Sequence, residues 1–73
     1  MKDYVKRIHD LRQKKRLSEQ DAAKYLNVSE DIYRQYELGT RDLPTQQLIK
    51  LSELFGVSID YILCITDKPE RLY

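Results

Sequence analysis

Residues 17–39, LSEQDAAKYLNVSEDIYRQYELG, constrain the fold more than any other stretch, because they read as two short helices joined by a tight turn. Ser18 is a good N-cap residue, and Asp21, three residues later, can return the bond in a looser form of the capping box. Asn27 tolerates the left-handed conformation that a helix end requires, so we expect the first helix to end there.

The second helix of the pair is expected over about residues 30–38, capped by Ser29 and ended by Gly39. Ala23 is the most informative residue of the first helix, because two helices that cross within a few residues of each other leave no room for a large side chain. We therefore interpret the unit as a helix-turn-helix. The side chains at helical spacing that should face inward are Ala22, Ala23 and Leu26, then Ile32 or Tyr33, then Tyr36.

Three more helices are expected around this unit. The first covers about residues 2–15, the fourth can be capped by Thr45 and ended by Gly56, and the fifth can be capped by Ser58. His9 lies off the apolar stripe of the first helix and is expected to be an ordinary surface side chain. The inward faces of these helices should carry Tyr4 or Val5, Ile8 and Leu11; Leu48, Leu51, Leu54 and Phe55; and Ile59, Ile62 and Leu63.

A chain of 73 residues can form one domain with a modest core, and its few glycines and prolines favour a compact all-α fold. No apolar run approaches the roughly 18–20 residues that a membrane span requires, and we see no signal-peptide core, so a cytoplasmic location is expected. The single cysteine, Cys64, cannot form an internal disulfide, which suits a reducing compartment. We expect it to be a small buried side chain of the last helix, with a dimer-linking or redox thiol as the alternative.

Charge is unevenly distributed along the chain, although the net charge is only +1. Residues 1–16 carry seven basic and two acidic side chains, whereas the remaining 57 residues carry six basic and ten acidic ones. A protein that reads DNA normally presents a basic face. Here the basic cluster lies beside the expected helix-turn-helix and not on it.

Several sequence segments resemble, in their order and spacing, those of the Cro/phage-repressor-type helix-turn-helix family of bacterial and phage regulators, also called the xenobiotic-response-element family. They are IHDLR from residue 8, LSEQDAA from residue 17, YELG from residue 36, Pro44, and FGVSIDYIL from residue 55. The resemblance covers about residues 4–66 and implies five helices, with the second and third forming the DNA-binding unit. It also implies that the third helix lies in the major groove. We expect a repressor-like domain over residues 1–66 and a tail over 67–73.

The resemblance also implies roles for single residues. Such proteins pair an arginine of the first helix with the glutamate before the glycine that follows the third, so we expect a partly buried, mainly structural ion pair between Arg12 and Glu37. The candidate DNA-binding residues are Ser18, Glu19, Ser29, Glu30, Asp31, Arg34, Gln35, Thr40 and Arg41.

Three acidic residues depart from the family pattern. Glu19 stands where relatives usually have a phosphate-contacting glutamine, while Glu30 and Asp31 open the reading helix where relatives place glutamine, arginine or small polar residues. Carboxylates stabilise the start of a helix, but facing DNA they lower non-specific affinity. An acidic side chain can still accept a hydrogen bond from a cytosine amino group, and Gln35 can bond adenine through two atoms. A solvated helix face is the alternative reading for Arg34 and Gln35.

Two functions therefore fit the sequence. The first is a sequence-specific transcriptional regulator, most simply a repressor, that binds a palindromic double-stranded DNA operator as a homodimer. Its dimer contact would use Ile59, Ile62, Ile65, Leu72 or Tyr73. The alternative is a repressor-like protein-interaction module with weak or no DNA binding, whose acidic surface of Glu19, Asp21, Glu30, Asp31 and Asp42 binds a basic partner.

An enzyme is not expected. The sequence has no nucleophile paired with a base, no glycine loop that could hold a phosphate and no metal-ligand spacing. We accordingly expect no cofactor and no metal.

Overall fold

The computed structural model describes residues 3–70, which form five helices without a strand. This confirms the expected all-α, five-helix fold, with the helix-turn-helix at the second and third helices. The helices are α1 (Asp3–Lys14), α2 (Glu19–Leu26), α3 (Glu30–Leu38), α4 (Thr45–Phe55) and α5 (Ile59–Ile62).

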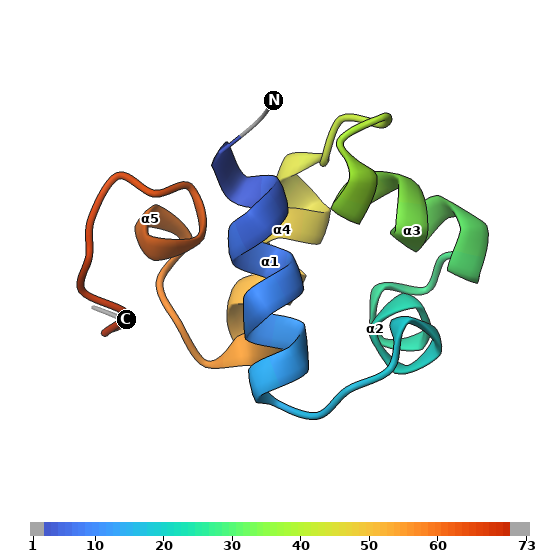
Figure 1. The fold of residues 1–73 in the computed structure, drawn as a ribbon, viewed down its shortest axis with the longest axis horizontal. Helices are drawn as coiled ribbons and strands as arrows, with labels where there is room; N and C mark the ends of the chain where they lie inside the picture. The colour runs from blue at the N-terminus through green and yellow to red at the C-terminus, as the bar shows by residue number, and fades with distance from the viewer. Residues whose placement is uncertain (1–2, 71–73) are drawn as a thin grey trace.

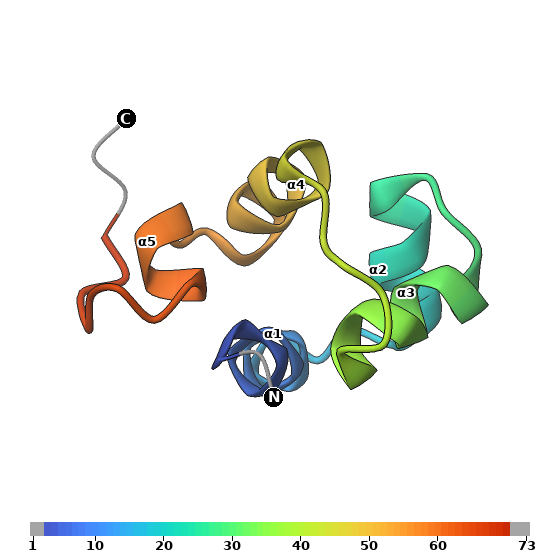
Figure 2. The ribbon, with the colours of Figure 1, turned by 90° about the horizontal axis from the view of Figure 1, so that it is seen from above.

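The five helices surround one core (Figures 1 and 2). Seen from above, α1 and α4 lie on opposite sides of that core, α2 and α3 close one end, and α5 closes the other (Figure 2). The expected inward positions are confirmed where they matter most for the helix-turn-helix, since Ala23 and Tyr33 are buried. The core consists of Ile8, Leu11, Ala22, Ala23, Leu26, Tyr33, Tyr36, Leu51, Phe55, Val57 and Ile62.

Local backbone chemistry explains where α2 begins and ends. The Ser18 hydroxyl accepts a hydrogen bond from the backbone N–H of Asp21 at 3.0 Å, and the Asp21 carboxylate accepts one from the Ser18 N–H at 3.1 Å. These two bonds satisfy N–H groups that the start of a helix leaves unpaired. Asn27 ends the helix in the left-handed conformation, with φ 59° and ψ 43°. The capping box and the asparagine stop are therefore confirmed.

The other helix starts divide into two kinds. Ser29 and Ser58 cap α3 and α5 as expected, each accepting a hydrogen bond from the backbone N–H three residues later. The prediction that Thr45 caps α4 is wrong. Thr45 is already the first helical residue, and the extended N-cap position belongs to Pro44, which has no side-chain group to offer. Proline has its φ fixed near the required value, so this start depends on backbone preference and not on a side-chain hydrogen bond.

The chain after α5 differs from the sequence prediction at Cys64. Cys64 is exposed and not buried, because the chain leaves the helix through a left-handed residue there, with φ 63°. The carbonyl of Pro69 accepts a hydrogen bond from the N–H of Ser58 at 2.9 Å, so the following segment folds back on the start of α5.

The predicted dimer contacts also need correction. Ile62 is completely buried within one chain and cannot contact a second copy, whereas Ile65 is exposed. Leu72 and Tyr73, the other terminal candidates, lie outside the described residues.

Candidate nucleic-acid interface

The outer face of α3 is available for a partner because the opposite face is anchored in the core. Tyr33 and Tyr36 form the anchored face, and their rings meet edge to face with centroids 6.5 Å apart. Two residues before Tyr33, the side chain of Asp31 is 84% exposed. The small side chain of Ala23 allows this arrangement, since α2 and α3 cross closely there and the turn is closed by a hydrogen bond from the Val28 N–H to the Ala23 carbonyl.

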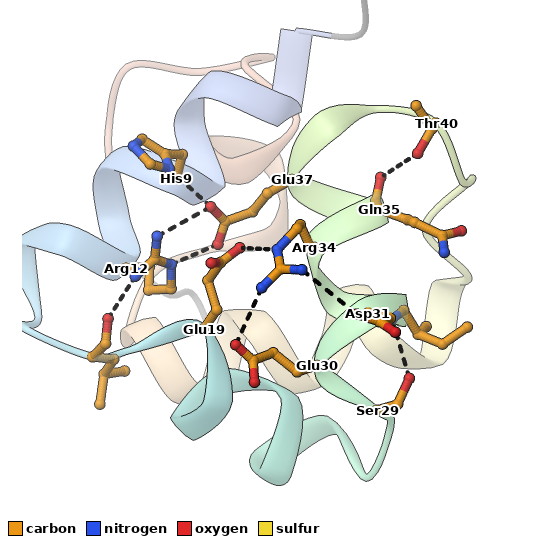
Figure 3. A network of polar contacts seen from close by, with 12 residues as sticks. His9, Arg12, Glu19, Ser29, Glu30, Asp31, Arg34, Gln35, Glu37 and Thr40 are labelled. Carbon is orange, nitrogen blue, oxygen red and sulfur yellow. Dashed lines mark hydrogen bonds and ion pairs between the residues drawn. The ribbon is translucent and has the colours of Figure 1, made fainter.

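Arg34 lies within a ring of three carboxylates on the outer face (Figure 3). Its guanidinium is 3.6 Å from the carboxylate of Glu19 on α2, 3.3 Å from that of Glu30 and 3.5 Å from that of Asp31. We call these four residues the Arg34 cluster. One positive and three negative charges leave it with a net charge of −2. The candidate cation of the reading helix is thus neutralised by its own neighbours before any DNA approaches.

A second group of candidates lies at the other edge of α3. Nε of Arg41 donates a hydrogen bond to Oε1 of Gln35 at 3.0 Å. The Thr40 hydroxyl donates to the backbone carbonyl of Gln35 at 3.4 Å (Figure 3). The structure therefore separates these candidates into two groups, the Arg34 cluster and the contacts around Gln35. The groups do not meet, because Arg34 and Gln35 point to different sides of the helix (Figure 3).

The two candidate serines use their hydroxyls mainly within the protein. Ser18 and Ser29 each accept a hydrogen bond from a backbone N–H at the start of a helix. Both are exposed, so each hydroxyl keeps its own proton to donate to a phosphate oxygen. Any phosphate contact would be added to the capping role and would not replace it.

Arg12 and Glu37 form an ion pair between α1 and the end of α3 (Figure 3). Nε of Arg12 is 2.6 Å from one carboxylate oxygen and a terminal nitrogen is 3.3 Å from the other, so the arginine holds the carboxylate with two bonds. Another terminal nitrogen donates to the carbonyl of Leu17 at 2.7 Å, just before α2. The pair therefore fixes the helix-turn-helix to α1 at two points.

His9 joins this ion pair, which the sequence analysis missed. Its Nδ1 lies 2.8 Å from a carboxylate oxygen of Glu37, although 43% of the side chain is exposed. The only available signal was that His9 precedes Arg12 by three residues, which places both on one side of α1. His9 is thus partly exposed, as expected of a surface residue, but its ring is hydrogen-bonded to Glu37.

The electrostatics of this buried group favour the charged pair. Burial by itself raises the pKa of Glu37, but the hydrogen bonds with the Arg12 guanidinium and the His9 ring outweigh it, and the pKa lies below its ordinary value. The hydrogen bond with Glu37 raises the pKa of Arg12. Burial raises the pKa of Tyr33, whose hydroxyl meets no partner at hydrogen-bond geometry among residues 3–70.

The basic cluster of the first helix is divided by the fold. Arg7 is turned toward α5, where its guanidinium lies 4.1 Å from the centre of the Tyr61 ring and donates to the Tyr61 carbonyl. Lys14, Lys15 and Arg16 are exposed at the end of α1, beside the start of α2. Among the described residues of this cluster, these last three form the exposed basic surface that adjoins the helix-turn-helix.

Residues 3–70 contain no cluster of three or more His, Cys, Asp or Glu side chains that could hold a metal ion. None of the five helices is both long and apolar enough to cross a membrane.

Residues 8–62 match the model of the family described as helix-turn-helix, which is most of the chain. This chain belongs to the helix-turn-helix family. The match confirms the resemblance to Cro/phage-repressor-type regulators that the sequence carries, and it includes all of α2, α3 and α4.

Similar curated proteins come from Bacillus subtilis (strain 168). The HTH-type transcriptional regulator ImmR is 41% identical over 58 residues, covering 80% of this chain and 46% of ImmR. The uncharacterized HTH-type transcriptional regulator YobD is 33% identical over 67 residues, covering 92% of this chain and 60% of YobD. The chain thus spans about half the length of the curated relatives it matches. No solved structure gives a significant match.

Proposed function

We propose that this chain is the DNA-binding part of a transcriptional regulator and that α3 enters the major groove of double-stranded DNA. The observation that carries the proposal is the match of residues 8–62 to the helix-turn-helix family. An outward face of α3, with Asp31 exposed and Tyr33 buried behind it, supports the docking geometry of such units.

Phosphate contacts would come from both sides of the reading helix. Lys14, Lys15 and Arg16 flank the start of α2, and Arg41 follows α3 in an exposed loop. Such contacts position a protein on the duplex without reading its sequence. Base contacts fall to the outer face of α3, where Asp31 offers hydrogen-bond acceptors and Gln35 offers an amide.

We further propose that the regulator is a repressor acting as a homodimer on a palindromic operator. ImmR and YobD are named transcriptional regulators, which supports regulation but not its sign. A single small domain makes few contacts, so tight binding requires two half-sites about 34–36 Å apart. Ile65 is 70% exposed after α5 and is the described residue best suited to the dimer contact. The domain limits at residues 1–66 and 67–73, and the cytoplasmic location, remain predictions.

The protein-interaction module is the second candidate, because the Arg34 cluster presents net negative charge on the surface that would meet DNA. Named relatives that are transcriptional regulators support DNA binding over this alternative. The salt dependence of binding to duplex DNA distinguishes the regulator from the interaction module. For a DNA-binding protein, the logarithm of the affinity falls steeply with the logarithm of the salt concentration.

The test is a mobility-shift titration with random duplex at low salt, followed by selection of bound sequences from a random-duplex library. We expect a retarded complex, a negative salt slope and a selected motif with two-fold symmetry. Absence of any retarded complex at low salt would overturn the proposal and leave the interaction module. Selected sequences with a single half-site would overturn the homodimer while retaining DNA binding.

A further inference from the structure

Gln35 and Arg41 meet at the end of α3 that lies away from the Arg34 cluster. The hydrogen bond joins Nε of Arg41 to Oε1 of Gln35 at 3.0 Å. A guanidinium nitrogen can only donate, so the amide atom that faces it must be the oxygen and not the nitrogen. The bond therefore fixes which end of the Gln35 amide is turned toward Arg41 and which is turned toward a partner.

The backbone places Arg41 at this position. The carbonyl of Gln35 accepts hydrogen bonds from the N–H of Thr40 at 3.1 Å and from the N–H of Arg41 at 3.4 Å. The Thr40 hydroxyl donates to the same carbonyl (Figure 3). Three bonds to one carbonyl hold the start of the loop against the last turn of α3, so Arg41 does not depend on a mobile loop to reach Gln35.

Other candidates at this edge do not compete for the amide. Arg34, on the neighbouring side of α3, is held by Glu19, Glu30 and Asp31 (Figure 3). The Gln35 amide points away from that cluster (Figure 3). What Gln35 turns toward a groove is therefore its amino group, which can only donate hydrogen bonds.

We propose that Arg41 is a positioning residue that sets the base preference of Gln35, so that Gln35 favours guanine over adenine. The inference rests on the proposed function. In the major groove guanine presents two acceptors, N7 and O6, whereas adenine presents the acceptor N7 and the donor N6. A free glutamine matches adenine, because its oxygen accepts from N6 and its nitrogen donates to N7. With its oxygen turned toward Arg41, Gln35 presents its amino group to the groove, and the two N–H donors of that group match the two acceptors of guanine.

The preference is measured on the motif selected by the unaltered protein. The base pair read by Gln35 is located with Gln35→Ala, which should lose discrimination at that pair and keep it elsewhere. Duplexes that carry G·C or A·T at the located pair are then compared. We expect the unaltered protein to bind the G·C duplex about tenfold more tightly, the size of a good direct base contact.

Arg41→Met removes the donor and keeps the bulk of the side chain. We expect the preference for G·C to fall below about twofold or to change to A·T, since without Arg41 the amide is free to turn its oxygen toward the groove. Arg41→Met also removes a positive charge, which weakens binding to every duplex alike. Lys15→Met is the matched control, because it removes one exposed charge beside the helix-turn-helix and should weaken both duplexes equally.

Three results would overturn the inference. Selection of adenine at the located pair by the unaltered protein would directly contradict the preference for guanine. A preference that Arg41→Met leaves unchanged would make Arg41 a phosphate contact only. Both of these leave the proposed regulator in place, whereas failure to retain any duplex overturns the regulator and the inference together.

Discussion

The guanidinium of Arg12 and the carboxylate of Glu37 lie 2.6 Å apart and join α1 to the last turn of α3. Both side chains are largely removed from water, with 11% and 5% of their surfaces exposed. Such a pair gains little net free energy when formed, because both charges lose their hydration, but removing one partner leaves the other charge buried and unpaired. The ion pair thus holds α3 to α1, and replacing either residue alone should destabilise the domain.

Replacing Arg12 with methionine should destabilise the protein strongly. The variant keeps the apolar stem but leaves the Glu37 carboxylate without its two guanidinium bonds, and we expect a loss of about 3 kcal/mol in the free energy of unfolding. Urea unfolding, monitored by circular dichroism, measures this loss in the free energy of unfolding. Lys6→Met is the control, since Lys6 and Asp10 form an exposed pair at 4.0 Å whose removal should leave the midpoint nearly unchanged. Equal effects of the two variants would contradict the structural role of the Arg12 pair.

The same ion pair makes stability depend on pH at the acidic end. The pKa of Glu37 is lowered from its ordinary value of 4.5, so between the two values the unfolded chain binds more protons than the folded one. Its contribution is therefore complete above that ordinary value and is lost as pH falls through the lower, folded value. Unfolding free energies of the unaltered protein and Glu37→Gln should differ most near neutrality and converge as pH falls. A difference that stays constant down to about pH 3 would contradict this assignment.

The sequence could predict features that depend on the backbone within one turn of a helix. The capping box of Ser18 and Asp21, the left-handed Asn27 and the caps at Ser29 and Ser58 all form as expected. In each case the residue type has an intrinsic preference that the rest of the fold does not need to supply. The buried Ala23 was predictable for a related reason, since only a small residue fits a close helix crossing.

Side-chain partners across helices were not predictable, because they depend on how the helices pack. Arg7 belongs to the basic cluster by sequence, yet it lies over the ring of Tyr61 on α5. His9 reaches Glu37 across α1 and α3. Cys64 is exposed because one left-handed residue redirects the chain after α5, which neither hydrophobicity nor spacing reveals.

Two glycines at helix ends should differ in their tolerance of alanine. Gly39 and Gly56 both have positive φ, 77° and 68°, which costs a side-chain-bearing residue about 1 kcal/mol. A Cβ on Gly39 would also lie 3.1 Å from Cγ2 of Val5, whereas one on Gly56 would meet no atom within 4 Å. Gly39→Ala should therefore lower the free energy of unfolding more than Gly56→Ala does. Equal losses would show that α1 yields at Val5 without cost.

Glu19→Gln should strengthen binding to random duplex DNA. Glu19 lies 3.6 Å from Arg34, so the change removes one of three carboxylates that hold this guanidinium, and it also removes a negative charge near phosphate. We expect about threefold tighter binding in a low-salt titration, within the range of a single partly exposed ion pair. Glu70→Gln changes the net charge equally, in a segment on the α5 side of the molecule, and should have little effect (Figure 1).

A double-mutant cycle separates the two causes of that gain. If Glu19 weakens binding by holding Arg34, then Glu19→Gln should give no gain once Arg34→Gln has removed the guanidinium. If Glu19 acts by repelling phosphate directly, the gain should be the same in both backgrounds. Release of Arg34 should also steepen the salt slope by about one, because the freed guanidinium then neutralises one more phosphate. We expect the first result, since all three acidic residues that depart from the family pattern are within 3.6 Å of this one side chain.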